Sequence, residues 1–308
     1  MSAESVCYRH PDREAYISCQ RCERPICPEC MRDASVGFQC PACIARGAKA
    51  VRQPRTAAGG AIPRNAGAAT WVLIGLNVAV YVVSVLLQEL GRTGLDVWGA
   101  IVGHAVVYDG QLVEGVAGGE YWRLLTSAFL HVGAMHLLFN MFGLYIFGQF
   151  LEERLGTARF VAFYLASAVF SGAVVFWLTG PNVPTVGASG AVFALFGLAL
   201  VLLLKSGQDV RTLVVLLGIN ALLSLRDGIS WQGHLGGFVA GVLFGLAIVV
   251  APRGRGALAQ TIGVAVLIVL TVVITALHQQ PAQQHQPPAA TTGRGAAEAR
   301  IPDEVRPR

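Results

Sequence analysis

A few polar residues stand inside long apolar segments, and their types suit acyl-transfer chemistry. Ser189 lies in the segment Gly187-Ala188-Ser189-Gly190, and His234 follows in a separate apolar segment. A serine hydroxyl becomes a nucleophile when an imidazole can take its proton. The flanking glycines would let a substrate backbone approach, and a helix that begins here would offer free N–H groups to a developing oxyanion. The pair therefore indicates nucleophilic catalysis in an apolar environment.

A further apolar segment carries His131, His136 and Asn140. His136 and Asn140 are four residues apart, so they share a helix face, and both can donate hydrogen bonds to an oxyanion. A single histidine could simply be buried between helices, but several such residues at matching depth favour a joint function. The histidines could in principle ligate a metal, although no carboxylate or cysteine joins them and no HExxH motif occurs.

All seven cysteines lie in the first 45 residues, where together with one histidine they form four pairs of two-residue spacing. Eight ligands suffice for two tetrahedral zinc ions with no open position, so structural sites are expected. An odd cysteine count in a cytosolic segment disfavours disulfides. The short gap between the second and third pairs favours alternate pairing, with Cys7, His10, Cys27 and Cys30 on one ion and Cys19, Cys22, Cys40 and Cys43 on the other.

Composition indicates the elements that must hold these residues. Hydrophobic residues make up 54% of the 308 residues and charged residues only 13%, against roughly 25% in soluble domains. This composition disfavours a soluble two-domain enzyme. The net charge of +5 does not indicate nucleic-acid binding, because the basic residues beyond the amino-terminal region are spread thinly among apolar blocks. The sequence predicts an all-α polytopic membrane protein.

Seven apolar blocks follow a basic linker, and most can cross a hydrocarbon core of roughly 30 Å as helices. The fifth is the shortest and would need a thin bilayer or shelter among its neighbours. A long connection over residues 89–123 separates the first two blocks and is expected to pack on the outer leaflet. The predicted blocks are residues 70–88, 124–151, 160–179, 186–204, 210–225, 231–250 and 257–277.

Small residues predict how two of these helices meet. Gly237, Gly241 and Gly245 recur every four residues in the sixth block, and Gly190, Ala194 and Gly197 line one face of the fourth. Small residues at this spacing let two helices pack closely. Close packing would bring the Ser189 hydroxyl within reach of His234.

The chain therefore divides into five predicted regions. They are a zinc-binding domain over residues 1–45, a flexible basic linker over 46–69, a six-helix core over 70–250, a further transmembrane helix over 251–277 and a disordered tail over 278–308. Lys and Arg gather in the linker and in alternate loops, which predicts a cytoplasmic amino terminus and an extracytoplasmic carboxyl terminus. No cleavable signal peptide precedes the polar head, so the zinc region is expected in the cytosol.

Residues 70–250 resemble the rhomboid family of intramembrane serine proteases. The resemblance rests on Trp122-Arg123, His131-x4-His136-x3-Asn140, Gly187-Ala188-Ser189-Gly190, and His234 with Gly237 and Gly241. It implies a six-helix core, a Ser189–His234 dyad without an acidic third member, and a water-accessible cavity that opens outward. It further implies an oxyanion hole from His136, Asn140 and the Ser189 backbone, and catalysis without a cofactor. Substrates of similar proteins are single transmembrane segments in the bilayer, with small, helix-destabilising residues near the cleaved bond.

The chain departs from the family pattern at two positions. Gly233 stands where the family often has Ala, and Phe193 stands where many relatives have Tyr. Packing of an aromatic ring on His234 could persist without the tyrosine hydroxyl. Asp227 is interpreted as a loop charge and not as a third catalytic member.

The amino-terminal region resembles the B-box type of cross-braced zinc finger, which implies a binding or oligomerising module with an unidentified cytosolic partner. Two alternatives to a protease are weighed. A non-proteolytic rhomboid-like binder usually lacks the serine or the histidine, and both are present here. A transporter would place charged residues or broken helices at the membrane midplane, whereas the polar residues here cluster in the outer third.

Overall fold

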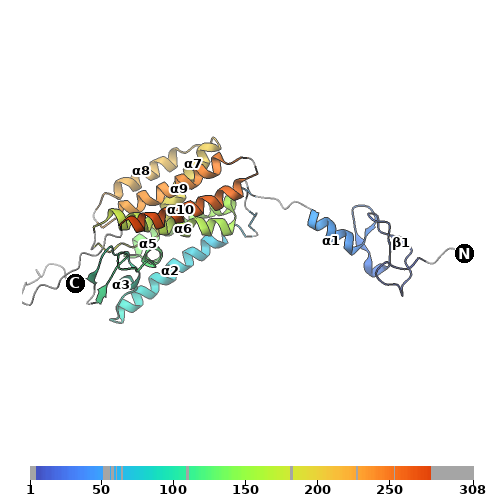
Figure 1. The fold of residues 1–308 in the computed structure, drawn as a ribbon, viewed down its shortest axis with the longest axis horizontal. Helices are drawn as coiled ribbons and strands as arrows, with labels where there is room; N and C mark the ends of the chain where they lie inside the picture. Colours follow the sequence, from blue (N-terminus) through green and yellow to red (C-terminus); the bar gives the residue numbers. More distant parts are fainter. Residues whose placement is uncertain are drawn as a thin grey trace, which may run out of the picture.

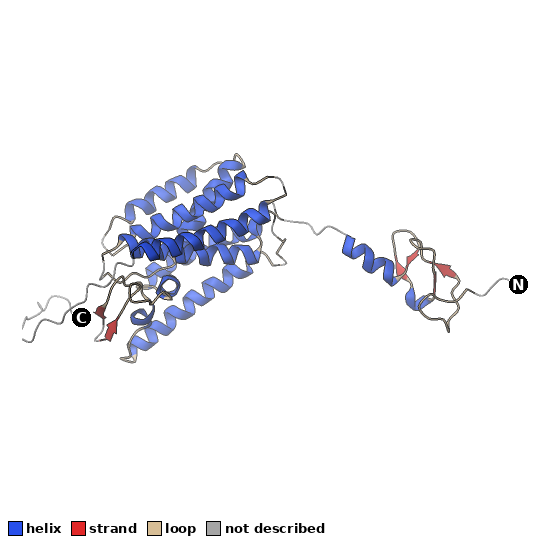
Figure 2. Ribbon diagram, viewed as in Figure 1, coloured by secondary structure: helices blue, strands red, loops and turns tan. Residues whose placement is uncertain are grey.

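The computed structural model describes residues 5–50, 56, 59, 61–63, 65–108, 111–180, 183–226, 228–252 and 254–278. Helices dominate these residues, and three short two-stranded sheets accompany them (Figure 2). The predicted helical class is therefore confirmed. Asp227, much of the predicted linker and the predicted tail beyond His278 lie outside the described residues.

The N-terminal module, residues 5–50, consists of short elements around its cysteines. The antiparallel strands β1 (Ile17–Ser18) and β2 (Pro25–Ile26) form one hairpin, and β3 (Arg32–Asp33) and β4 (Phe38–Gln39) form another. A 3-10 turn over Pro28–Cys30 lies between the hairpins, and α1 (Pro41–Ala50) ends the module. Strands this short cannot bury a core by themselves. The buried cysteines, with Ala15 and Ile26, form the core instead.

The rest of the described chain is a bundle of apolar helices (Figure 1). Among the described residues, five helices are long and apolar enough to cross a membrane, and two apolar helices are shorter. This marks a multi-pass membrane protein. The long helices are α2 (Ala68–Glu89), α5 (Ala134–Leu155), α6 (Thr157–Leu178), α9 (Trp231–Val250) and α10 (Gly256–His278), and the shorter ones are α7 (Ser189–Lys205) and α8 (Arg211–Leu223).

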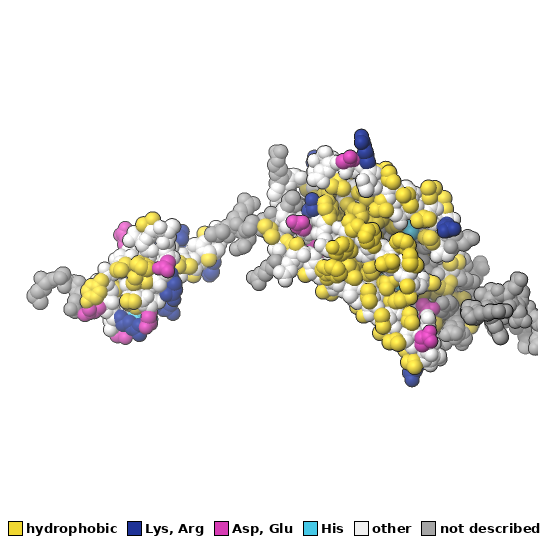
Figure 3. Space-filling model, turned by 180° about the vertical axis from the view of Figure 1, so that it is seen from behind, with side chains coloured by type: hydrophobic (Ala, Val, Ile, Leu, Met, Phe, Trp, Pro, Cys, Tyr) yellow, Lys and Arg dark blue, Asp and Glu magenta, His cyan; other side chains and the backbone are white. Residues whose placement is uncertain are grey.

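Apolar side chains cover the outside of this bundle. On α2, the exposed fractions of Trp71, Val72 and Leu86 are 57%, 70% and 56%. Figure 3 shows hydrophobic side chains spread over one face of the bundle, with charged side chains toward its edges. Water does not tolerate a contiguous apolar surface of this extent. Lipid is the solvent that suits it.

Helix α6 forms the interior of the bundle, with 67% of its apolar window buried. It contacts α9 and α10, and the ring of Phe163 stacks on Phe244 of α9 with 4.3 Å between centroids. Gly263 of α10 lies against the same Phe244 ring. The helix α10 is therefore packed into the bundle.

The predicted block 124–151 is wrong at its amino-terminal end. The short helix α4 (Arg123–Thr126) and a 3-10 turn over Ser127–Phe129 come first, and α5 begins only at Ala134. Gly133, just before α5, has a φ of +84°, a conformation that glycine adopts without steric cost. His131 therefore lies in the turn before α5, and not on the helix that carries His136 and Asn140.

The connection between α2 and α5 is folded. It contains α3 (Leu95–Gly99) and a hairpin of β5 (Val106–Tyr108) and β6 (Gln111–Val113). The buried Arg123 holds it together: Nη1 donates to the carbonyls of Val97 and Ala100 at 2.9 and 3.0 Å, and Nε donates to Glu120 at 2.7 Å. A buried guanidinium is stable only when paired and hydrogen-bonded in this way.

A second buried charge joins the bundle where α2 begins. The Glu152 carboxylate accepts from the backbone N–H groups of Ala69 and Thr70 at 3.1 and 3.0 Å. It also accepts from the hydroxyls of Thr70 and Thr157 at 2.9 and 3.0 Å. The first N–H groups of a helix have no partner within the helix, and a negative charge at this end is favourable. Glu152 thus caps α2 and joins it to α5 and α6.

Candidate active site

Helices α7 and α9 pack with their backbones in direct contact. A Cβ built on Gly237 would overlap the carbonyl oxygen of Gly190, and one built on Gly241 would overlap that of Ala194. Glycine is required at both positions because any side chain would push the helices apart. The close packing predicted from the small-residue spacing is confirmed.

Ser189 is the first residue of α7, and the segment before it is anchored by backbone hydrogen bonds. Thr185 exchanges two such bonds with Ile101, each 2.9 Å long, and the Gly187 N–H donates to the Ser127 carbonyl at 2.9 Å. The cap residue Ala188 has no side-chain acceptor for the first N–H groups of α7. These groups therefore donate no hydrogen bond to the cap side chain.

Gly187 keeps open the space between Ser189 and His136. Its φ is +135°, which strongly favours glycine. A Cβ at this position would lie 2.8 Å from Nε2 of His136 and 3.6 Å from Oγ of Ser189. Both side chains therefore border the same small volume, which any larger residue at position 187 would fill.

The imidazole of His234, the fourth residue of α9, is held from two directions. The ring of Phe193 stacks on it, with 4.1 Å between centroids and 7° between planes. Phe193 lies one turn after Ser189 on α7, so the stack fixes the imidazole beside the first turns of that helix. Its Nδ1 lies 2.5 Å from the hydroxyl oxygen of Ser224. Ring packing on His234 thus occurs with Phe at position 193.

The Ser189 hydroxyl has no hydrogen-bond partner among the described residues. The polar contact of His234 goes to Ser224 instead. Nucleophile–base contacts are often long without substrate and tighten in the complex. The structure therefore brings Ser189, His136 and His234 to one end of α7 without a bond between the hydroxyl and the imidazole.

The two other polar residues of this region contact His136. The buried Asn140 donates from Nδ2 to the His136 carbonyl at 2.9 Å, which uses one of its two amide protons. The buried ring of His131 lies edge-on to that of His136, with 5.1 Å between centroids. His131 is thus a packing partner of the His136 imidazole.

Ser224 is the polar residue at this site that the sequence analysis missed. It follows the last residue of α8 and is 4% exposed. No motif marks it, because a serine at a helix end is common in turns. Only the path of the chain from α8 to α9 places it against His234.

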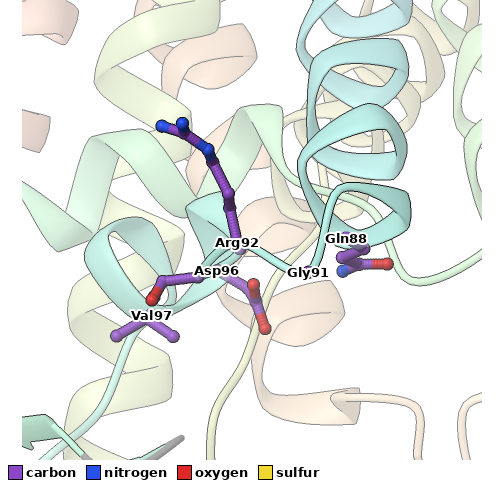
Figure 4. Close-up of a pocket in the computed structure, with 7 residues that line it drawn as sticks. Gln88, Gly91, Arg92, Asp96 and Val97 are labelled. Carbon is purple, nitrogen blue, oxygen red and sulfur yellow. The ribbon is translucent and has the colours of Figure 1, made fainter.

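A separate pocket of about 540 Å³ lies where α2 meets α3 (Figure 4). Gln88, Gly91, Arg92, Asp96 and Val97 line it, and the Arg92 side chain extends away from Asp96. No residue of the serine site is among the described residues that line it.

The N-terminal module gathers the eight predicted metal ligands into two groups, and within each group the ligand atoms lie within 4.8 Å of one another. A tetrahedral zinc ion with bonds of about 2.0–2.3 Å separates its ligand atoms by roughly 3.5–3.8 Å. The Cys22 and Cys40 sulfurs are 3.8 Å apart, and His10 Nδ1 lies 3.3 Å from the Cys27 sulfur. The groups are Cys7, His10, Cys27 and Cys30, and Cys19, Cys22, Cys40 and Cys43, which is the spatial grouping that the alternate pairing predicts.

The pKa values of two of these thiols are lowered to about 6. Burial opposes ionisation of Cys7, but the backbone N–H groups of Arg9, Cys27 and His10 outweigh it and lower the pKa to about 6. Burial likewise opposes ionisation of Cys19, and neighbouring backbone N–H groups, with Cys40 first, lower its pKa to about 6. The thiolate is the form that binds a metal ion. Both groups could therefore hold zinc.

The fold and the site define a helical membrane protein with a serine at a helix amino terminus beside a stacked imidazole. Residues 118–251 match the Rhomboid domain family. This chain belongs to the rhomboid family, whose members are intramembrane serine proteases. Its cysteine and histidine groups add a region that fits a zinc finger.

Three relatives illustrate the extent of the similarity. The chain is 38% identical to YdcA of Bacillus subtilis (strain 168) over 136 residues, 42% of this chain and 68% of that protein. It is 33% identical to the rhomboid protease GluP of the same organism over 167 residues, 51% of this chain and 32% of that protein. It is 35% identical to RHOMBOID-like protein 4 of Arabidopsis thaliana over 145 residues, 45% of this chain and 36% of that protein. The chain thus spans about a third of the latter two.

Proposed function

We propose that this chain is a serine endopeptidase that cleaves transmembrane segments of membrane proteins near the outer leaflet. One observation carries the proposal: Phe193 of α7 stacks on His234, which holds the imidazole beside the helix that Ser189 begins. The apolar surface of the bundle means that a transmembrane segment can reach the site through the lipid.

Ser189 is the proposed nucleophile and His234 the proposed general base. The imidazole takes the hydroxyl proton as the Ser189 oxygen attacks the peptide carbonyl carbon, and then gives that proton to the leaving amine. Water then attacks the acyl carbon and loses a proton to His234, and the imidazolium returns that proton to the Ser189 oxygen as the acyl group leaves as a carboxylic acid. This chemistry needs no cofactor.

His136, Asn140 and the Ser189 backbone N–H are the proposed oxyanion donors. His136 Nε2 borders the same volume as the Ser189 hydroxyl, beside Gly187. Asn140 keeps one amide proton beyond the one it gives to the His136 carbonyl. One such donor contributes roughly 3–4 kcal/mol to transition-state stabilisation in a measured case. His131 supports the set by packing on His136, Gly187 keeps the space open, and Gly190 leaves room for Ser171 and the Gly233 carbonyl.

The remaining regions complete the proposal. The predicted zinc-binding domain over residues 1–45 holds two structural zinc ions. The proposed linker over 46–69 joins this domain to the protease core. The proposed core over 70–250 is followed by the added helix over 251–277 and the tail over 278–308. The Lys and Arg distribution supports a cytoplasmic amino terminus and an extracytoplasmic carboxyl terminus. The module binds a cytosolic partner; one candidate is the cytosolic end of a substrate.

Cleavage of a transmembrane substrate by the purified chain in liposomes tests the proposal. Ser189→Ala is expected to abolish cleavage, and Asn140→Ala to lower kcat about 100-fold. Ser206→Ala is the matched control, because Ser206 is exposed and lies just beyond the opposite end of α7. A fluorophosphonate should label the wild type and the control but not Ser189→Ala. Undiminished cleavage by Ser189→Ala would overturn the proposal.

A further inference from the structure

His234 has a polar partner that a serine–histidine dyad does not require. Its Nδ1 lies 2.5 Å from the Oγ of Ser224, which follows α8 and is 4% exposed. Two heteroatoms at this distance in a buried place must share a proton. Which atom donates it determines the tautomer of the imidazole.

A second hydrogen bond of Ser224 decides the question. Its Oγ lies 2.7 Å from the carbonyl oxygen of Asn220, one turn earlier in the chain. A carbonyl oxygen can only accept, and a serine hydroxyl has a single proton. The Ser224 proton is therefore donated to Asn220, and Oγ offers only lone pairs to His234. In the neutral ring, Nδ1 must then carry the proton, and Nε2 is left as the basic nitrogen.

The two contacts of the imidazole restrict different motions. The Phe193 ring, 7° from parallel to the imidazole and stacked on it, prevents the imidazole from tilting. Stacking alone would still permit a half-turn that exchanges the nitrogen and carbon positions of the ring. The hydrogen bond to Ser224 is directional, because its Oγ can accept only from a ring nitrogen and not from a ring carbon. Together these contacts leave one orientation and one tautomer.

We propose that Ser224 is a positioning residue for the serine reaction: its Oγ accepts the Nδ1–H of His234 and so keeps Nε2 unprotonated and available as the base. This inference rests on the proposed roles of Ser189 and His234. In the reaction Nε2 gains the Ser189 proton and later passes it to the leaving amine, while Nδ1 keeps its own proton throughout. Ser224 is a neutral acceptor in the place where many serine hydrolases have a carboxylate.

The tautomer can be measured without any cleavage assay. The full chain with ¹⁵N-labelled histidine, in lipid, is studied by solid-state NMR, and the His234 signals are assigned by their loss in His234→Asn. The wild type is expected to show a protonated Nδ1 and an unprotonated Nε2. In Ser224→Ala the Nε2–H form should gain population. A wild-type ring protonated at Nε2, or an unchanged ratio in Ser224→Ala, overturns the proposal.

Kinetics in liposomes give the second readout. Ser224→Ala is expected to lower kcat about 5- to 10-fold with KM unchanged, as loss of one neutral hydrogen bond predicts. Ser224→Thr keeps the hydroxyl and should restore kcat to within about twofold. The control is Ser84→Ala on α2, because Ser84 makes the same bond to the carbonyl four residues earlier, at 2.9 Å, and no hydrogen bond joins it to a histidine among the described residues. Equal kcat for Ser224→Ala and Ser84→Ala overturns the proposal. If no form of the chain cleaves, the proposed function fails, and NMR still decides the tautomer.

Discussion

The N-terminal module and the serine site both gather residues from separate parts of the chain, but different interactions do so. In the module, the Cys and His residues come in pairs of two-residue spacing within and beside the short hairpins, and the ligand-type atoms of each group of four lie within 4.8 Å of one another. At the serine site, α7 and α9 touch through Gly190 and Gly237, and single side chains then meet across the contact. The comparison teaches that the module has little core beyond its cysteines, whereas helix packing holds the serine site together.

Metal removal should produce the largest effect. The module has little core besides its cysteines, and zinc contributes roughly 10–16 kcal/mol to comparable small folds. A zinc chelator is therefore expected to unfold residues 5–50 of the full chain and leave the helices folded. Limited proteolysis would show new cuts confined to the module. A calcium-selective chelator is the control, and a module that resists both chelators would contradict the proposed zinc sites.

Gly237→Leu tests the helix contact at the serine site. A side chain at this position meets the carbonyl of Gly190, so α7 and α9 must separate. We expect a loss of about 3 kcal/mol in the free energy of unfolding, at the upper end of overpacking effects, together with loss of serine labelling. Unfolding of the protein in mild detergent would measure it. Gly75→Leu on α2 is the control, because no atom lies within 4 Å of a Cβ there; equal stability of the two variants would refute the contact.

Glu152→Gln tests a buried polar junction of the same bundle. The carboxylate has four donors, and an amide would turn an N–H₂ toward some of them. The expected loss is about 1–3 kcal/mol in the free energy of unfolding. Glu153→Gln, the exposed neighbour, should change it by less than about 0.5 kcal/mol. Chemical unfolding of both variants gives the comparison, and a stable Glu152→Gln would mean that the cap is unnecessary.

Phe193 variants should give the smallest effect. Phe193→Leu removes the stack on His234, which is worth about 0.5–1.5 kcal/mol for an aromatic pair, so kcat should fall about 2- to 10-fold. Phe193→Tyr keeps the ring and should stay within about twofold of the wild type. Initial cleavage rates at saturating substrate measure both. A Phe193→Leu variant as fast as Phe193→Tyr would show that the stack is dispensable.

Several elements could be predicted because local sequence carries their physical cause. Helix α9 spans Trp231–Val250 as predicted, because an apolar run of membrane length admits no other stable structure in lipid. The prediction of one helix over residues 124–151 was wrong at its amino-terminal end. Apolarity alone cannot separate a membrane helix from the buried turn around His131, and the break depends on Gly133 and on the burial of Arg123.

Residue spacing was sufficient to predict the two Cys/His groups and the contact of α7 with α9, since both depend on short, regular intervals along the chain. The Ser224–His234 bond and the Glu152 cap emerged only from the folded bundle. Each of these contacts joins residues whose separation along the chain follows no helical or strand repeat. Such contacts depend on how helices cross and how loops return, and these are properties of the packed molecule as a whole.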